Sequence, residues 1–113
     1  MPGHRIGRVS EDIKREVTAV VRELKDPRVS GCLLTVVRVD VSSDASFAKV
    51  YVSAMEGMDR AKTAVEGLKS ATGLIRREVG GRLGLRKTPE LKFIADDSVA
   101  YGMEIARKLN ELK

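Results

Sequence analysis

The spacing of the hydrophobic residues changes along this chain, and these changes constrain the fold more than any other feature. Over residues 6–25, apolar side chains recur three and four positions apart, which predicts an amphipathic helix. Residues 33–41 and 46–54 alternate between two faces, which predicts two strands. The turn chemistry of Ser42-Ser43-Asp44 lies between them and predicts an antiparallel hairpin.

Two details of this first half follow from the same pattern. Asp26-Pro27 should end the first helix, because proline disfavours helical geometry in the residue before it, and residues 28–31 should form a turn. We expect the buried face of the hairpin to carry the odd-numbered positions of 33–41 and, in the second strand, Ala48, Val50, Val52 and Ala54.

Helical spacing returns over about 58–83, with a break at Ala71-Thr72-Gly73, because an interior glycine costs about 1 kcal/mol relative to alanine. A third strand over 90–95 follows Pro89, and a last helix spans about 98–112. The order α-β-β-α-(kink)-α-β-α predicts an α+β fold with a three-stranded sheet and helices packed on one face. At 113 residues, we expect a single domain over 1–113.

Composition excludes several classes of protein. The single cysteine, Cys32, allows no intrachain disulfide and fits a reducing compartment, so we expect a cytoplasmic location. No apolar run reaches the roughly 20 residues that span a bilayer. His4 is the only histidine, and Asp96-Asp97 fits a helix cap better than an acid–base pair. We therefore expect no enzyme activity, no metal, no cofactor and no small-molecule substrate.

Positive charge is concentrated in one third of the chain. Residues 60–92 contain nine basic and three acidic residues, a net charge of +6, whereas the whole chain carries +5. Clustered Lys and Arg gain free energy by releasing counterions from phosphates, so this asymmetry favours a nucleic-acid partner. A generic basic surface that aids solubility is the alternative.

The break between the two central helices is the candidate binding site. Its backbone segment is Ala71-Thr72-Gly73, and basic residues flank it on both sides. The N-terminal helix adds two more arginines. The candidate contacts to phosphates are Arg5, Arg8, Lys69, Arg76, Arg77, Arg82, Arg86 and Lys87. The alternative is that this segment is a flexible helix joint whose arginines are solvated and have no binding role.

Several blocks of the sequence together resemble the bacterial ribosome-binding factor A family. They are Asp26-Pro27-Arg28-Val29, Val41-Ser42-Ser43-Asp44, residues 48–53, residues 83–93 and Asp97-Ser98. The resemblance covers nearly the whole chain. It implies a type II KH-like fold and a monomer that binds the free 30S subunit. It also implies help in late maturation of precursor 16S rRNA, including its 5′ region, and a role in growth in the cold.

One KH feature is replaced in this sequence. KH domains clamp nucleotides with a Gly-x-x-Gly loop between two helices. Here the resemblance assigns Ala71-Thr72-Gly73 to that position, whereas Gly81-Arg82-Leu83-Gly84 lies after the second helix, where we expect only a loop. Recognition by charge and shape is therefore favoured over single-strand readout. Phe47 and Tyr51 could form a base-stacking platform, but cross-strand packing explains them more simply.

Two other functions remain open from the residues. One is a general KH-type binder of single-stranded RNA or DNA that is not tied to ribosomes. The other is a protein-interaction module whose basic surface meets an acidic partner.

Overall fold

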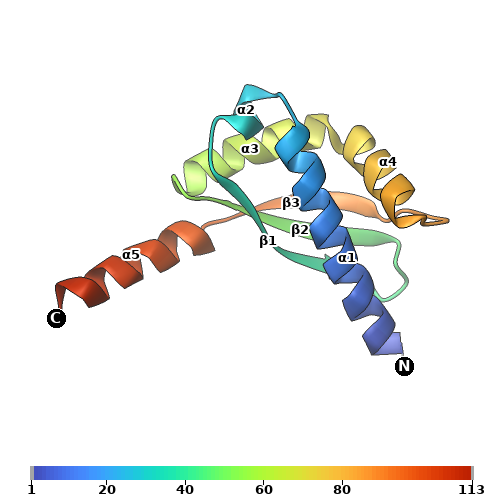
Figure 1. Cartoon of the computed structure of the whole chain (residues 1–113), viewed down its shortest axis with the longest axis horizontal. Helices are drawn as coiled ribbons and strands as arrows, with labels where there is room; N and C mark the ends of the chain where they lie inside the picture. Colours follow the sequence, from blue (N-terminus) through green and yellow to red (C-terminus); the bar gives the residue numbers. More distant parts are fainter. Residues whose placement is uncertain (1, 113) are drawn as a thin grey trace.

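The computed structural model describes the backbone of residues 2–112 and the side chains of residues 8–112. The sheet contains β1 (Leu34–Val41), β2 (Phe47–Ala54) and β3 (Glu90–Asp96) in the order β1-β2-β3. Strands β1 and β2 are antiparallel, and β2 and β3 are parallel. The helices are α1 (Pro2–Glu23), α2 (Pro27–Ser30), α3 (Met58–Ser70), α4 (Thr72–Leu83) and α5 (Ser98–Glu111) (Figure 1).

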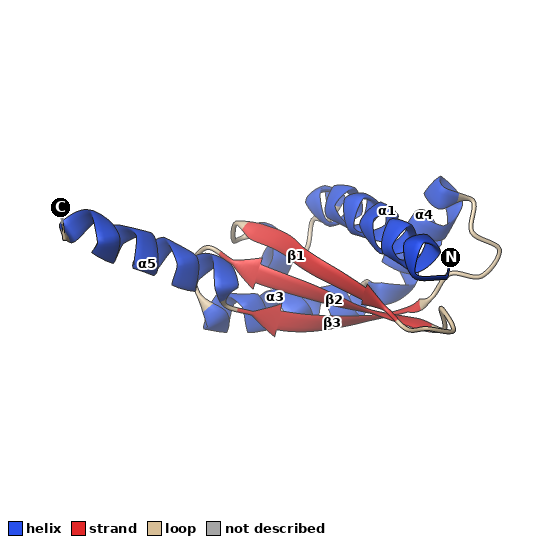
Figure 2. Ribbon diagram, turned by 90° about the horizontal axis from the view of Figure 1, so that it is seen from below, coloured by secondary structure: helices blue, strands red, loops and turns tan. Residues whose placement is uncertain are grey.

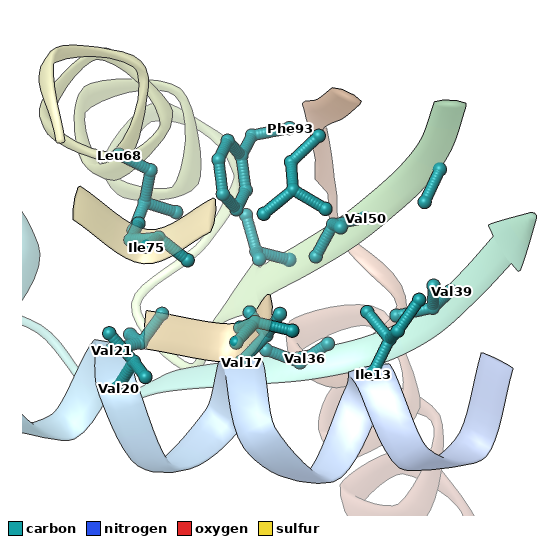
Figure 3. Packing of buried hydrophobic residues seen from close by; sticks show 14 of the residues in the cluster. Ile13, Val17, Val20, Val21, Val36, Val39, Val50, Leu68, Ile75 and Phe93 are labelled. Carbon is teal, nitrogen blue, oxygen red and sulfur yellow. The ribbon is translucent and has the colours of Figure 1, made fainter. Parts of the chain in front are cut away.

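Helices α1, α3 and α4 cover one face of the sheet (Figure 2). A parallel pair such as β2 and β3 needs a long crossover connection, and α3 and α4 together provide it. Figure 3 shows the apolar side chains that fill the space between the layers. The fully buried ones include Ile13 and Val17 of α1, Val50 of β2, Leu68 of α3 and Ile75 of α4. The α+β fold expected from the sequence is confirmed.

A β-bulge at Val37 changes which side chains of β1 are buried. Val36 pairs with Val52 and Arg38 with Tyr51, so Val37 is an extra residue in the ladder. Val36 and Val39 are buried, while Thr35 and Leu33 are exposed. The expected burial of odd-numbered positions is therefore wrong before the bulge. It holds at Val39, because the extra residue exchanges the two faces of the strand.

The segment expected as a turn contains the short helix α2. Asp26 caps it by accepting a hydrogen bond from Arg28 N at 2.9 Å, and Pro27 occupies its first position. Val29 is buried where α2 lies against α3. A Cβ atom at Gly67 of α3 would come within 2.8 Å of the Val29 side chain, so glycine permits this close approach. The prediction failed because a turn signal and a capped four-residue helix look alike in sequence.

Helix α5 differs from the expected packing. Its first turn contacts the sheet, where Val99 N donates a hydrogen bond to Ser53 Oγ at 3.2 Å. The remainder extends beyond the end of the sheet (Figures 1 and 2), and none of its residues is buried. Leu109 is 59% exposed. The last helix was expected to pack on the sheet with the other helices, but the direction in which the chain leaves β3 carries it away from the sheet.

Candidate nucleic-acid interface

The junction of α3 and α4 is held by a dense set of hydrogen bonds. Ala71 N donates to Leu68 O at 3.1 Å, and Ala71 O accepts from Ile75 N at 2.9 Å, so one residue ends one helix and begins the next. The Thr72 hydroxyl donates to Lys69 O at 2.9 Å, which satisfies a carbonyl at the end of α3. Ala71 and Thr72 therefore set the angle between the helices.

Gly73 presents open backbone at this junction. It is exposed, and a Cβ atom built there would have no neighbouring atom within 4 Å. Packing inside the protein therefore does not require a glycine at this position. The open backbone leaves room for a phosphate chain to approach the start of α4.

Two of the expected basic residues lie on the surface beside this junction. Lys69 is exposed in the last turn of α3 and lies 3.8 Å from Glu66. Arg77 is exposed on α4, one turn after Gly73. Among the side chains that the structure describes, Arg77 takes part in no ion pair. Its guanidinium is thus available to an anionic partner.

Arg28 is a basic residue at this junction that sequence reasoning did not assign to the site. Its Nη2 atom lies 3.3 Å from Ser70 Oγ, although 42 positions separate the two residues. A paired contact with Asp26, as close as 2.7 Å, raises the pKa of Arg28 and lowers that of the carboxyl. The Asp26-Pro27-Arg28-Val29 block was the available signal, and only the packing of α2 on α3 gives it this location.

Arg76 does not project freely from α4. Its Nε and Nη2 atoms donate to the Thr88 carbonyl at 3.1 and 2.7 Å, and the side chain is partly buried. The sequence predicted that Arg76 contacts phosphate, whereas these two hydrogen bonds join α4 to the segment before β3.

Arg82 is also engaged within the protein. Its Nη2 atom donates to the Glu23 carboxylate at 3.1 Å, which raises the pKa of the guanidinium. Glu16 and Glu78 lie 3.8 and 3.7 Å away. With three carboxylates around one cation, this location does not favour a phosphate, and Arg82 joins α4 to α1.

Arg86 and Lys87 are exposed in the loop between α4 and β3. This loop begins at Gly84, whose φ of 64° is the left-handed conformation that glycine adopts without strain. Gly81, Arg82 and Leu83 belong to the last turn of α4 and Gly84 is its C-cap, so the expectation that this Gly-x-x-Gly lies in a loop after the helix is wrong. Helix α4 is about 18 Å long at 1.5 Å per residue, and it separates this loop from the junction.

The N-terminal arginines lie elsewhere. Arg8 is exposed near the start of α1, which Figure 1 shows far from the α3–α4 junction. The side chain of Arg5 lies outside the described residues. The structure therefore does not bring Arg8 together with the other candidates.

The aromatic residues on the open face of the sheet are covered by cations from neighbouring strands. Arg38 lies over the Tyr51 ring at 4.3 Å, and Lys92 lies over the Phe47 ring at 4.5 Å. These contacts favour cross-strand packing over a base-stacking platform, because the ring faces already have partners.

Within the described residues, no helix is long and apolar enough to cross a membrane.

Comparison with known proteins gives one consistent family. The ribosome-binding factor A family model matches residues 5–109. Ribosome-binding factor A of Acetivibrio thermocellus is 48% identical over 108 residues, covering 95% of this chain and 87% of the relative. Its counterpart in Clostridium tetani is 44% identical over 114 residues, covering 100% of this chain and 93% of the relative.

Solved structures agree with the sequence matches. A crystal structure of ribosome-binding factor A from Thermus thermophilus is similar, with a TM-score of 0.71 and 29% identity, covering 80% of this chain and 93% of that chain. A homology model of Thermus thermophilus ribosome-binding factor A, fitted into a cryo-EM map of its complex with the 30S subunit, has a TM-score of 0.61 and 30% identity, covering 74% of this chain and 86% of that chain. From its sequence and its fold, this chain belongs to the ribosome-binding factor A family.

Proposed function

We propose that this protein binds the free small ribosomal subunit and assists late maturation of 16S rRNA. The single observation that carries the proposal is family membership over nearly the full chain. A relative of the same fold has been fitted into a map of its complex with the 30S subunit, which supports the same partner here. The protein would act as a cytoplasmic monomer, without cofactor or substrate turnover.

The contact would be electrostatic and would use a cationic surface, which we define as Lys69, Arg77, Arg86 and Lys87. These side chains are exposed and come from α3, α4 and the loop that follows α4. Gly73 leaves the backbone beside Lys69 and Arg77 open. Arg28 borders this surface through Ser70, whereas Arg5 and Arg8 would make a separate contact. Since every phosphate contact releases counterions, binding should weaken steeply with salt.

Sedimentation of cell lysate through a sucrose gradient at moderate salt tests the partner. The protein should comigrate with free 30S particles and leave them as salt rises. A general single-strand binder would follow other RNA or the nucleoid instead. A protein-interaction module would remain bound to its partner after nuclease treatment. Either result would contradict the proposal.

A matched pair of variants tests the surface. Arg77→Ala should lower the magnitude of the salt slope by about 0.7, the value for one single-strand phosphate contact. Arg107→Ala removes the same charge from α5, where the guanidinium lies 3.8 Å from Glu104, and should leave the slope unchanged. Equal effects of the two variants would indicate a general response to net charge and not a defined surface.

The role in maturation needs a separate measurement in cells. Depletion of the protein should increase the fraction of 16S rRNA with an unprocessed 5′ end, and the defect should be larger at low temperature. Complementation with Arg107→Ala should restore processing, whereas a variant that lacks Arg77, Arg86 and Lys87 should not. Normal 5′ ends at low temperature in depleted cells would refute this part of the proposal.

A further inference from the structure

The loop between α4 and β3 is fixed to the body of the protein at both ends. At its start, Leu85 N donates to Gly80 O at 3.0 Å, and Gly84 takes the left-handed conformation that turns the chain out of the helix. At its end, Pro89 is buried, and Glu90 N donates to Ser46 O at 3.0 Å as β3 begins. Arg86 and Lys87 lie between these anchors and are exposed.

Thr88 ties the end of this loop to the middle of α4 in two ways. Its carbonyl accepts both hydrogen bonds from Arg76, at 3.1 and 2.7 Å. Its side chain lies directly on Gly80, where an added Cβ atom would overlap Thr88 Oγ1. Gly80 is buried, although it belongs to the interior of a helix, where glycine is otherwise unfavourable. The close approach of Thr88 accounts for a glycine at this position.

We propose that Arg76, Gly80 and Thr88 are positioning residues, which hold Arg86 and Lys87 ready to meet rRNA phosphates. A loop that is already ordered loses less conformational entropy when it binds, so the same two charges give tighter binding than they would on a mobile loop. Arg76 then acts through the loop and makes no phosphate contact of its own. This inference rests on the proposed function.

A double-mutant cycle separates positioning from direct contact. The affinity of the full-length protein for purified free small subunits is measured over a series of salt concentrations. Arg86→Ala with Lys87→Ala should weaken binding about tenfold and lower the slope magnitude by about 1.4, for two contacts at about 0.7 each. In the wild-type background, Arg76→Met should weaken binding, but by no more than this tenfold loss of affinity. In the background without Arg86 and Lys87, it should change the affinity by less than about twofold.

A compensating pair tests the packing independently of any charge. Gly80→Ala should weaken binding, because the new methyl group displaces Thr88. Adding Thr88→Ala should restore it: the remaining Thr88 Cβ lies 3.4 Å from the new methyl group, and the carbonyl that Arg76 holds is retained. Thr88→Ala alone serves as the control. All affinities are compared at a temperature where circular dichroism shows every variant folded, so that loss of stability does not affect the result.

The outcomes are distinct. An undiminished loss from Arg76→Met in the background without Arg86 and Lys87 would mean that Arg76 touches RNA itself, which overturns the inference. Wild-type affinity in Gly80→Ala, or no recovery in the double variant, would also overturn it. These results leave the proposed function intact. A wild-type chain that binds no small subunit at low salt would remove the proposed function, and this inference with it.

Discussion

Arg82 of α4 donates hydrogen bonds to both carboxylate oxygens of Glu23 of α1 at 3.1 Å, across 59 positions of sequence. This pair shows that charge in the sequence does not equal charge available to a partner. Two of the basic residues that made α4 a candidate RNA contact, Arg76 and Arg82, are engaged within the protein. The exposed cations beside them are therefore the better candidates for binding.

The first prediction concerns Arg82→Met, which keeps most of the apolar stem and removes the charge. We expect a lower melting temperature, because three carboxylates, Glu16, Glu23 and Glu78, lose the cation among them. The salt slope of subunit binding should not change. Thermal unfolding and a salt titration check the two effects. Arg77→Ala is the comparison, because it should keep the wild-type melting temperature and lower the magnitude of the salt slope. A shallower slope in Arg82→Met would show that this residue does contact RNA.

Gly73→Ala should separate stability from binding. The position is helical and has open space where the methyl group would go, so alanine should raise the free energy of unfolding by about 0.5–1 kcal/mol. Binding to small subunits should weaken, because the methyl group occupies the path of the phosphate chain. Denaturant unfolding and affinity measurements test this in the same sample. Unaltered affinity would show that RNA does not approach the backbone at Gly73.

The exposed apolar residues of α5, such as Ile105 and Leu109, should contribute little to the stability of the core. Ile105→Ser should change the free energy of unfolding by no more than about 0.5 kcal/mol, since the side chain is exposed in the folded protein. Leu68→Ala, at a fully buried position, should cost about 2–5 kcal/mol and serves as the comparison. Urea unfolding of both variants decides the matter. A comparable loss in Ile105→Ser would mean that α5 packs on the domain in solution.

The hairpin turn should make stability depend on acidic pH. Hydrogen bonds from the Ser46 and Ser42 hydroxyls and from Ser46 N lower the pKa of Asp44 from 3.8 to about 2. A carboxyl whose pKa is lower in the folded chain stabilises that chain when ionised. Its contribution is complete above pH 3.8 and is lost as the pH falls to about 2.

Asp44→Ala should therefore be less stable than the wild type at pH 7, and the two melting temperatures should converge between pH 4 and pH 2. Thermal melts at three pH values measure this difference. A gap that persists at pH 2 would show that the turn depends on the shape of the side chain and not on its ionisation.

Local signals in the sequence were sufficient for most elements. The hairpin, the break at Ala71 and the third strand follow from period, turn residues and an interior glycine, all of which act within a few positions. The bulge at Val37 has no such signal, because the residue fits a strand equally well with or without an extra position. One such residue exchanges the buried and exposed faces of everything before it.

By itself, the sequence determined the order of the elements, the concentration of basic residues and the family. Only the tertiary structure decided which cations already have partners within the protein, since Arg82 meets Glu23 and Arg28 meets Ser70 across long stretches of chain. It also decided that α5 leaves the sheet. The physical reason is common to both: hydrophobic period and propensity act between neighbours, whereas ion pairing and burial depend on residues brought together from distant parts of the chain.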